Sequence, residues 1–140
     1  HVIEPTFGLG RHVLAVLAKA YTEDELGGET RMYLKFPKHL APVKAAVFPL
    51  LKNKPELVAK ACEVYAALKN EIPQIMFDDN GNIGKRYRRQ DEIGTPVCIT
   101  IDFDTLGESG EENKNTVTVR DRDTGEQKRV AINDLVSYIR

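Results

Sequence analysis

The chain has 140 residues, of which 41% are hydrophobic and 29% are charged, and its formal net charge is −1. This length is enough for one domain with a buried core. No stretch approaches the ~20 apolar residues of a membrane span, the first residues lack the order of a signal peptide, and a near-neutral charge excludes bulk attraction to nucleic acid. We therefore expect a soluble, cytoplasmic protein without a membrane partner, in which any nucleic-acid binding depends on local patches.

The first 36 residues predict a short leading module and a linker. The run "HVIEP" predicts a strand at Val2 and Ile3 that ends at Pro5, and its abrupt start suggests an internal piece of a longer protein. "FGLGRHVLAVLAKAY" then predicts a turn entering a helix. The apolar stripe of this helix comprises Val13, Leu14, Val16, Leu17, Ala20 and Tyr21. Residues 22–31, "TEDELGGETR", have the composition of a loop, so we divide the chain into residues 1–21, a linker at 22–36 and a second module at 37–140.

The second module begins with three predicted strands that alternate with helices. Val43–Leu50 is mostly apolar, as expected for a strand that is covered on both faces. Asn53 is predicted to cap a helix that starts at Lys54 and Pro55. Its buried stripe comprises Leu57, Ala61, Val64, Tyr65 and Leu68. "PQIMFDD" and Val97–Phe103 are the next two strands.

The end of the chain predicts an antiparallel hairpin and a final helix. Gly107–Asn115 is an expected mobile loop, and "NTVTVRDRDTGEQKRVAI" alternates polar and apolar residues around a turn at 123–125. Asn133 is predicted to cap "DLVSYIR". The whole pattern predicts an α/β fold with a mixed, mainly parallel five-stranded sheet flanked by helices, preceded by a strand-turn-helix segment.

The cysteines and histidines indicate no catalytic or metal site. Cys62 and Cys98 are far apart in apolar contexts and are predicted to be small core residues. His12 and His39 lack an obvious partner, so each is predicted to be a surface or core histidine. "DDNG" lacks the acid spacing of a calcium loop, and no metal ligand is predicted.

The stretch "IGKRYRRQDEIGTP", from Ile83 to Pro96, concentrates positive charge in a chain that has almost no net charge. Four cations lie within five residues: Lys85, Arg86, Arg88 and Arg89. On a helical wheel they occupy one arc, and Ile83 and Tyr87 lie opposite. Arginine forks suit phosphate, so this face is a candidate RNA-binding surface. The alternative is a solvated helix face that Asp91 and Glu92 partly neutralise, and the residues of this segment leave both interpretations open.

Two further segments each have a functional and a purely structural interpretation. In "EPTFGLGR", from Glu4 to Arg11, glycines before a helix and a cation in its first turn would suit a phosphate, but a glycine-rich turn without ligand explains them equally. It is not a dinucleotide fingerprint, because Val13 stands where glycine or alanine is needed. The charged run at 120–123, "RDRD", predicts cross-strand ion pairs, with RNA contact as the alternative.

Four segments taken in order resemble the dimeric, class II glycyl-tRNA synthetases. These are "HVIEPTFGLGR", "FPKHLAPVKAAVFPL", "DDNGNIGKRYRRQDEIGTP" and "ITIDFDTL…TVTVRDRD". The resemblance covers nearly the whole chain and is to the C-terminal part of that family. It implies that residues 1–21 are the end of the catalytic domain and that residues 37–140 are the anticodon-binding domain.

The resemblance also implies roles for individual residues near the N-terminus. "FGLGR" corresponds to the third class II motif, so Arg11 is the implied catalytic residue, on the γ-phosphate of ATP, and the backbone of residues 8–10 (Gly8, Leu9 and Gly10) would line the nucleotide site. "EPT" corresponds to the glycine-binding turn. There Glu4 would pair with the ammonium of glycine, the Thr6 hydroxyl would assist, and Gly8 would line the site; family members commonly carry serine at the position of Thr6.

For the whole enzyme the resemblance implies a homodimer that uses ATP and Mg²⁺ to form glycyl-adenylate and transfers glycine to tRNA(Gly). The cationic stretch at 85–89 would then meet phosphates of the anticodon stem. This chain lacks the first two class II motifs, so we expect no aminoacylation and no bound cofactor from it alone. Two rival classes remain on sequence grounds: a stand-alone anticodon-binding-like accessory or RNA-binding protein, and a nucleotide-binding enzyme that uses "FGLGR" as its phosphate loop.

Overall fold

The predicted mixed sheet is confirmed in the computed structural model, which describes residues 2–108 and 110–140. Its five strands are β3 (Ala45–Pro49), β4 (Ile75–Phe77), β5 (Val97–Ile101), β6 (Thr116–Asp121) and β7 (Gln127–Ala131). They are arranged in the order β4-β3-β5-β6-β7. Strand β3 pairs in parallel with both β4 and β5, whereas β6 pairs antiparallel with β5 and β7. The fold is therefore α/β, with an antiparallel hairpin at one edge.

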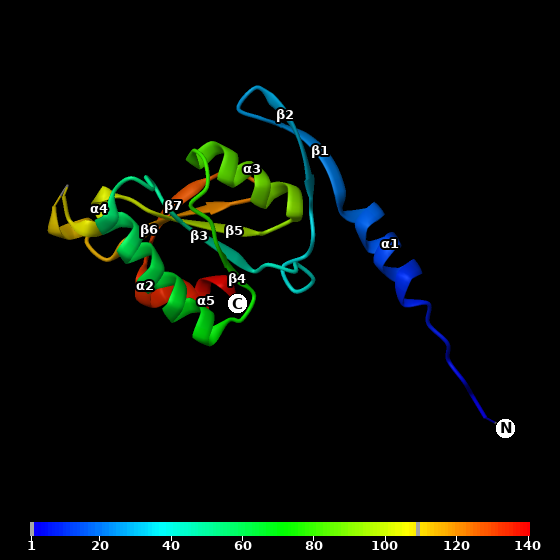
Figure 1. The fold of residues 1–140 in the computed structure, drawn as a ribbon. Helices are drawn as coiled ribbons and strands as arrows, with labels where there is room; N and C mark the ends of the chain where they lie inside the picture. Colours follow the sequence, from blue (N-terminus) through cyan, green and yellow to red (C-terminus); the bar gives the residue numbers. More distant parts are fainter. Residues whose placement is uncertain (1, 109) are drawn as a thin grey trace.

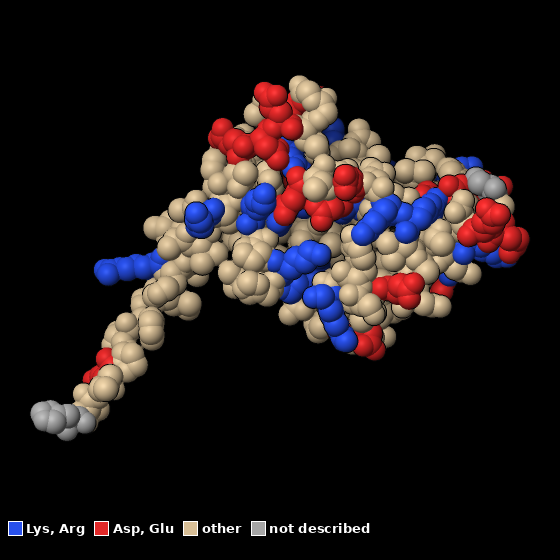
Figure 2. Space-filling view, turned by 180° about the vertical axis from the view of Figure 1, so that it is seen from behind, with Lys and Arg blue, Asp and Glu red and all other residues tan. Residues whose placement is uncertain are grey.

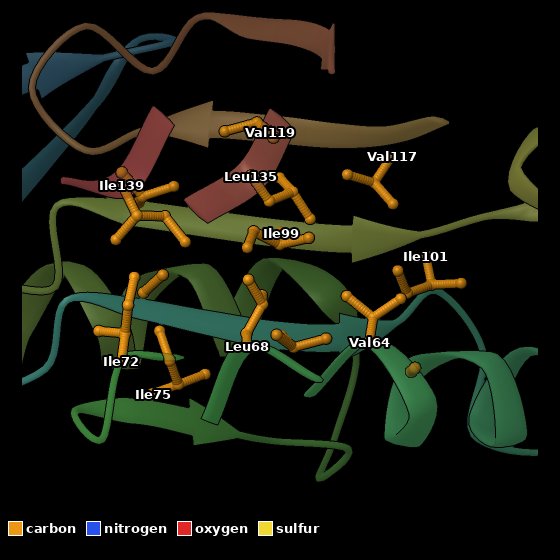
Figure 3. Packing of buried hydrophobic residues seen from close by; sticks show 14 of the residues in the cluster. Val64, Leu68, Ile72, Ile75, Ile99, Ile101, Val117, Val119, Leu135 and Ile139 are labelled. Atoms are coloured by element: carbon orange, nitrogen blue, oxygen red, sulfur yellow. The ribbon is translucent and has the colours of Figure 1, made fainter. Parts of the chain in front are cut away.

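Helices cover both faces of this sheet because the buried strands carry apolar residues on both sides (Figure 1). Helices α2 (Pro55–Glu71) and α5 (Leu135–Ile139) pack on one face. There Leu68, Ile99 and Leu135 point into a common core (Figure 3). The predicted stripe of α2 is confirmed, although Tyr65 is only partly buried.

Helix α3 (Ile83–Ile93) covers the opposite face, where Ile83 and Tyr87 pack on Phe48 and Cys98. Asn82 begins this helix by accepting a hydrogen bond from the backbone N–H of Lys85, at 2.9 Å. Gly94 ends it in the left-handed conformation, with φ of 83°. The predicted short helix is therefore confirmed, and its axis lies along the sheet with one side facing solvent.

The predicted linker is wrong in its secondary structure. Residues 21–34 form an antiparallel hairpin of β1 (Tyr21–Leu26) and β2 (Glu29–Leu34), in which Tyr21 pairs with Leu34. Its glycines, Gly27 and Gly28, are the turn residues, both with positive φ. The sequence pattern predicts a loop because this segment is rich in charged residues, which are rare in buried strands.

The N-terminal strand prediction is also wrong, whereas the helix prediction after it is correct. Residues 2–8 have no regular secondary structure, and α1 (Leu9–Ala20) follows them as an exposed helix that projects from the body (Figure 1). Of its predicted apolar stripe, only Ala20 is buried, and Tyr21 belongs to β1. No neighbouring strand within the described residues pairs with Val2 and Ile3, so their β propensity alone does not produce a strand.

Several local predictions differ from the structure by a residue or in detail. Helix α2 has Lys54 rather than Asn53 at its cap position, and α5 follows a 3₁₀ turn, η2 (Ile132–Asp134), with Asp134 at its cap position rather than Asn133. Cys98 is buried as predicted, but Cys62 lies on the exposed side of α2.

The predicted loop at 107–115 holds a little more structure than expected. A short helix, α4 (Phe103–Leu106), ends just before it and is capped by Asp102, and a 3₁₀ turn, η1 (Glu111–Asn113), lies within it. Ser109, which also falls in this predicted loop, lies outside the described residues.

Candidate functional site

The four cations of α3 do not share one environment, contrary to the helical-wheel prediction. Lys85 and Arg88 are on the solvent side of the helix, where Lys85 is exposed and the Arg88 side chain is 52% exposed. Arg89 is half-exposed and pairs with Asp78, with Nη2 2.6 Å from Oδ2. Arg86 is only 1% exposed, although the wheel places it at the edge of the cationic arc.

Arg86 is a structural residue in this fold. Its guanidinium donates to the carbonyl of Pro49 at the end of β3, and to the carbonyls of Asp79 and Gly81, at 3.0 and 2.7 Å. No carboxylate forms a hydrogen bond with it among the described contacts, and burial lowers the pKa of this group. The predicted placement of Arg86 on an open cationic face is therefore wrong, and its donors are directed away from any external phosphate.

The two arginines on the solvent side of α3, Arg88 and Arg89, have acidic neighbours. Nε of Arg88 lies 3.5 Å from the Glu92 carboxylate, one helical turn away. Arg89 also donates to the carbonyl of Asn80 at 2.6 Å. Exposed pairs of this kind contribute little to stability, about 0–1 kcal/mol each, so these side chains remain able to exchange partners. The solvent face of α3 is consequently a modest cationic surface formed by Lys85, Arg88 and, in part, Arg89.

A second group of arginines is buried between α3, the β1–β2 hairpin and the β6–β7 turn. This arginine cluster contains three guanidinium and three carboxylate side chains: Asp24, Arg31, Asp91, Arg120, Arg122 and Asp123. Asp91 lies at its centre. It accepts from Arg120 at 2.9 and 3.0 Å and from Arg31 at 3.0 Å. Arg31 in turn makes a two-fold contact with Asp24, at 2.6 and 2.9 Å.

The electrostatics of the arginine cluster favour its charged form. The hydrogen bond from Arg31 lowers the pKa of Asp24, and the same bond raises the pKa of Arg31. Burial alone would lower the pKa of Arg120, but the Asp91 carboxylate outweighs burial and the net shift is upward. Each buried ion thus has a close partner, which is the condition under which buried charges are tolerated.

Arg122 donates hydrogen bonds to backbone carbonyls and does not form an ion pair across the β6–β7 hairpin. It donates to the carbonyls of Leu34, Gly94 and Phe36 at 3.1, 2.9 and 3.0 Å. Arg120 pairs with Asp91 of α3, so neither arginine of the "RDRD" run makes the predicted cross-strand ion pair, and both are buried. Local sequence patterns do not reveal this role, because the partners of the two side chains lie 28 to 88 positions away along the chain.

Beside α3, the same face of the sheet presents a polar surface over β5 and β6. The Tyr87 hydroxyl contacts the Thr100 hydroxyl at 2.7 Å, and Thr118 donates to Asp102 at 2.8 Å. Arg129 of β7 pairs with Asp102 at 3.0 Å. Thr118, Asp102 and Arg129 are only partly buried, so this surface offers hydrogen-bonding groups of both kinds to a polar ligand next to the solvent face of α3.

The N-terminal candidate residues lie apart from this surface, on the exposed segment that leads into α1. Glu4, Thr6 and Arg11 are all exposed, and Gly8 occupies the cap position of the helix. His12 is exposed and contacts the carbonyl of Gly8 through Nδ1 at 2.9 Å. Leu9 and Gly10 form the exposed first turn of α1. The chain itself therefore does not enclose the predicted glycine and ATP site.

The charge distribution shows separate groups rather than one continuous basic face. In Figure 2, acidic side chains gather over the β1–β2 hairpin, whereas Lys and Arg lie in several smaller groups over the body. Within the residues that the structure describes, no group of three or more His, Cys, Asp or Glu side chains could hold a metal ion. In the same residues, no helix combines the length and the apolar character that crossing a bilayer would require.

The mixed sheet and the helices that cover both its faces form an α/β domain, which is consistent with the fold of an anticodon-binding domain. The chain belongs to the family described as "Anticodon binding domain", whose sequence model matches residues 44–140. It is also similar, over its whole length, to proteins named glycine–tRNA ligase. It is 48% identical over 145 residues to that of Thermus thermophilus, which aligns with 100% of this chain and 29% of the relative.

Two further glycine–tRNA ligases show the same relationship. The Deinococcus radiodurans protein is 50% identical over 143 residues, covering 99% of this chain and 28% of the relative. The Clostridium acetobutylicum protein is 50% identical over 140 residues, with 99% of this chain and 28% of the relative covered. The chain thus spans less than a third of the length of these curated relatives.

Proposed function

We propose that this chain is the tRNA-docking part of a glycine–tRNA ligase and that it binds the anticodon stem of tRNA(Gly). The observation that carries the proposal is the combination of an anticodon binding domain over residues 44–140 with about 50% identity to glycine–tRNA ligases along the whole chain. Because every relative described above carries that name, the ligase is favoured over a stand-alone accessory protein.

The RNA-binding surface is proposed to be the solvent face of α3 with the neighbouring polar surface of the sheet. Lys85 and Arg88 are the main phosphate ligands, and Arg89 is a third that exchanges Asp78 for a phosphate. Arg86 is not included, because its side chain is buried and both its Nη atoms donate to backbone carbonyls. Three phosphate contacts give a modest, salt-dependent affinity, and the partly exposed Thr118, Asp102 and Arg129 supply hydrogen bonds to bases.

The longer ligase is proposed to be a cytoplasmic homodimer that activates glycine with ATP and Mg²⁺. The exposed segment from Glu4 to Arg11 would complete its glycine and ATP site only together with the rest of that protein. Glu4 would pair with the substrate ammonium, Thr6 would assist, the 8–10 backbone would line the nucleotide, and Arg11 would stabilise charge on the γ-phosphate.

Titration of tRNA(Gly) at two salt concentrations tests the docking surface. The double variant Lys85→Gln/Arg88→Gln is expected to bind more weakly and to reduce the slope of log K against log salt by about 1.4–1.8, the value for two lost phosphate contacts. The matched control is Lys60→Gln/Lys128→Gln, which removes the same charge from the opposite face of the sheet and should change the slope little. Equal slopes for the parent and both double variants would show that α3 is only a solvated face.

A further inference from the structure

Helix α1 and the β1–β2 hairpin form one continuous unit. Tyr21, the first residue of β1, directly follows Ala20, the last residue of α1. The backbone N–H of Lys35 donates to the Ala20 carbonyl at 2.7 Å, and the Ala20 side chain packs with Phe36 and Ala41. Since α1 projects from the end of the hairpin (Figure 1), the position of the hairpin sets the direction of the helix.

Arg31 of β2 fastens the middle of the hairpin to two other elements at once. Its Nη1 atom donates to Asp91 of α3 and to the carbonyl of Arg122, at 3.0 and 2.7 Å. Nε and Nη2 donate to Asp24 on the neighbouring strand, at 2.6 and 2.9 Å. Nη2 also donates to the carbonyl of Asp123 at 3.2 Å. The guanidinium thus ties the hairpin both to α3 and to the β6–β7 turn.

The hairpin is also held at its tip and at its base. At the tip, Leu26 packs on Gly125 of the β6–β7 turn so closely that an added Cβ there would lie 2.8 Å from Leu26 Cδ2. At the base, Arg122 donates to the carbonyls of Leu34 and Gly94, which joins the end of β2 to the end of α3. We call these contacts, together with the guanidinium contacts above, the hairpin joint. Attachment at the tip, the middle and the base prevents the hairpin from pivoting on α3.

The charged contacts of the hairpin joint specify direction more strictly than apolar packing does. Apolar side chains tolerate small sliding movements, whereas a guanidinium fork keeps its hydrogen bonds only over a narrow range of distance and angle. A buried ion network is often no more stable than an apolar core of the same volume, so stability alone does not account for this one. The joint lies between α3, with the proposed phosphate ligands, and α1, which starts at the predicted ATP-binding residues.

We propose that the hairpin joint sets the angle between a tRNA bound on α3 and the catalytic segment at the start of α1, with Arg31 as the positioning residue; this inference rests on the proposed function. Arg31 is buried, so it acts through the direction of α1 and not by contact with RNA or substrate. Because tRNA is long and stiff, a small change in angle at the anticodon stem moves its 3′ end much farther. A misplacement of about 1 Å at the reacting atoms can cost about 100-fold in rate, so a loosened joint slows glycyl transfer without weakening tRNA binding.

Kinetics of the full-length ligase test this role with Arg31→Lys. Lysine keeps the charge, but its single ammonium cannot replace a planar fork that reaches Asp24 and Asp91 together. The single-turnover rate of glycyl transfer to saturating tRNA(Gly) should fall roughly 10- to 100-fold. The Kd of tRNA should change little, and so should glycine-dependent pyrophosphate exchange, which needs no tRNA. Arg140→Lys is the matched control and should leave all three unchanged, because Arg140 is exposed and lies near Glu71 of α2, at 3.6 Å, on the opposite face of the sheet.

Spin-label distances in this chain measure the rigidity of the joint directly. Cys62 of α2 is exposed and can be labelled, whereas Cys98 is buried and burial raises the pKa of its thiol. A second label at Leu14→Cys on α1 should give a narrow distribution of distances to Cys62, and Arg31→Lys should broaden it. The control pair, Cys62 and Lys128→Cys, lies within the sheet domain and should stay narrow in both backgrounds, which verifies that the variant is folded.

The outcomes separate this inference from the proposed function. If tRNA(Gly) does not bind this chain in the salt titration, the proposed function fails and this inference fails with it. If tRNA binds as expected, three results overturn the inference alone. These are a broad distribution of distances from Cys62 to residue 14 in the parent, an unchanged distribution or transfer rate in Arg31→Lys, and a pyrophosphate exchange rate that falls together with transfer. A weaker tRNA Kd with an unchanged transfer rate would likewise show that Arg31 supports the RNA surface and not the angle.

Discussion

Helix α1 and the β1–β2 hairpin are adjacent in the chain, but the apolar segment is exposed and the polar segment is partly buried. The helix "LGRHVLAVLAKA" is largely apolar, yet Leu14 is 68% exposed and only Ala20 is buried. The hairpin "YTEDELGGETRMYL" is largely polar, yet Arg31 and Tyr33 are buried in it. Composition therefore does not decide which segment packs against the rest of the domain. The segment that packs is the one that finds complementary residues there.

The hairpin is held because its charges meet fixed complementary charges. Asp91 of α3 and the carbonyl of Arg122 accept from one Arg31 nitrogen, at 3.0 and 2.7 Å. The apolar face of α1 meets no comparable surface among the described residues beyond the small cluster of Ala20, Phe36 and Ala41. Since the relatives are more than three times as long as this chain, we expect the rest of the longer protein to cover that face.

The largest expected effect comes from removing the carboxylate on which the hairpin depends. Asp91→Asn leaves Arg31 and Arg120 buried without their shared anion, and the free energy of unfolding should fall by about 3–5 kcal/mol. Urea unfolding measures this loss, and hydrogen exchange should show that the β1–β2 amides lose protection first.

The neighbouring exposed acid provides the control for that experiment. Glu92→Gln removes the same charge from α3, but its only described ion pair is the exposed one with Arg88, so its effect should stay within about 0.5 kcal/mol. If Asp91→Asn were equally mild, charge pairing would not be what holds the hairpin, and the comparison with α1 would lose its physical basis.

A smaller effect is expected from changing the close contact between α3 and the hairpin. Gly94→Ala combines a left-handed residue, costing about 1–2 kcal/mol, with overlaps on the Phe36 ring and on the backbone carbonyl of Leu34 that add about 1–3 kcal/mol. Gly28→Ala is the matched control, because Gly28 also has positive φ but an added Cβ meets nothing within 4 Å. Thermal unfolding measures the loss of stability in both variants, and the difference between the two losses is the contribution of the close contact at Gly94. A loss of stability that was the same in both would mean that Phe36 and the Leu34 carbonyl move aside freely.

The smallest effect is expected in α1. Leu14→Ser replaces an exposed apolar residue, so the stability of this chain should change by less than about 0.5 kcal/mol. The same substitution in the full-length ligase should destabilise it measurably, because there the helix face is expected to be covered. A loss well above this limit in the isolated chain would show that α1 packs on its body in solution, contrary to the exposed position described above.

The fold was largely predictable because its signals are local and repeated. The strands at 43–50 and 97–103, the helix with Leu57 and Leu68 on one stripe, and the turn at 123–125 each follow from periodicity and turn residues, and all are present. The positions of caps were less predictable, as Asn53 and Asn133 show, since several polar residues near a helix start can serve equally.

The candidate site was less predictable than the fold. A helical wheel separates the residues of α3 by angle, but it cannot tell a guanidinium that faces water from one that faces the carbonyls of Pro49 and Gly81. For the same reason the sequence pattern predicts cross-strand pairs for Arg120 and Arg122, although their partners come from α3 and from the end of the hairpin.

By itself, the sequence determined the α/β class, the order of strands and helices in the second module, and the similarity to glycyl-tRNA synthetases, because periodicity and motif order are properties of the chain alone. Only the tertiary structure decided which charges are available to a ligand. The free energy of a charged side chain depends on what lies within a few ångströms of it, and residues up to 92 positions apart supply those neighbours here.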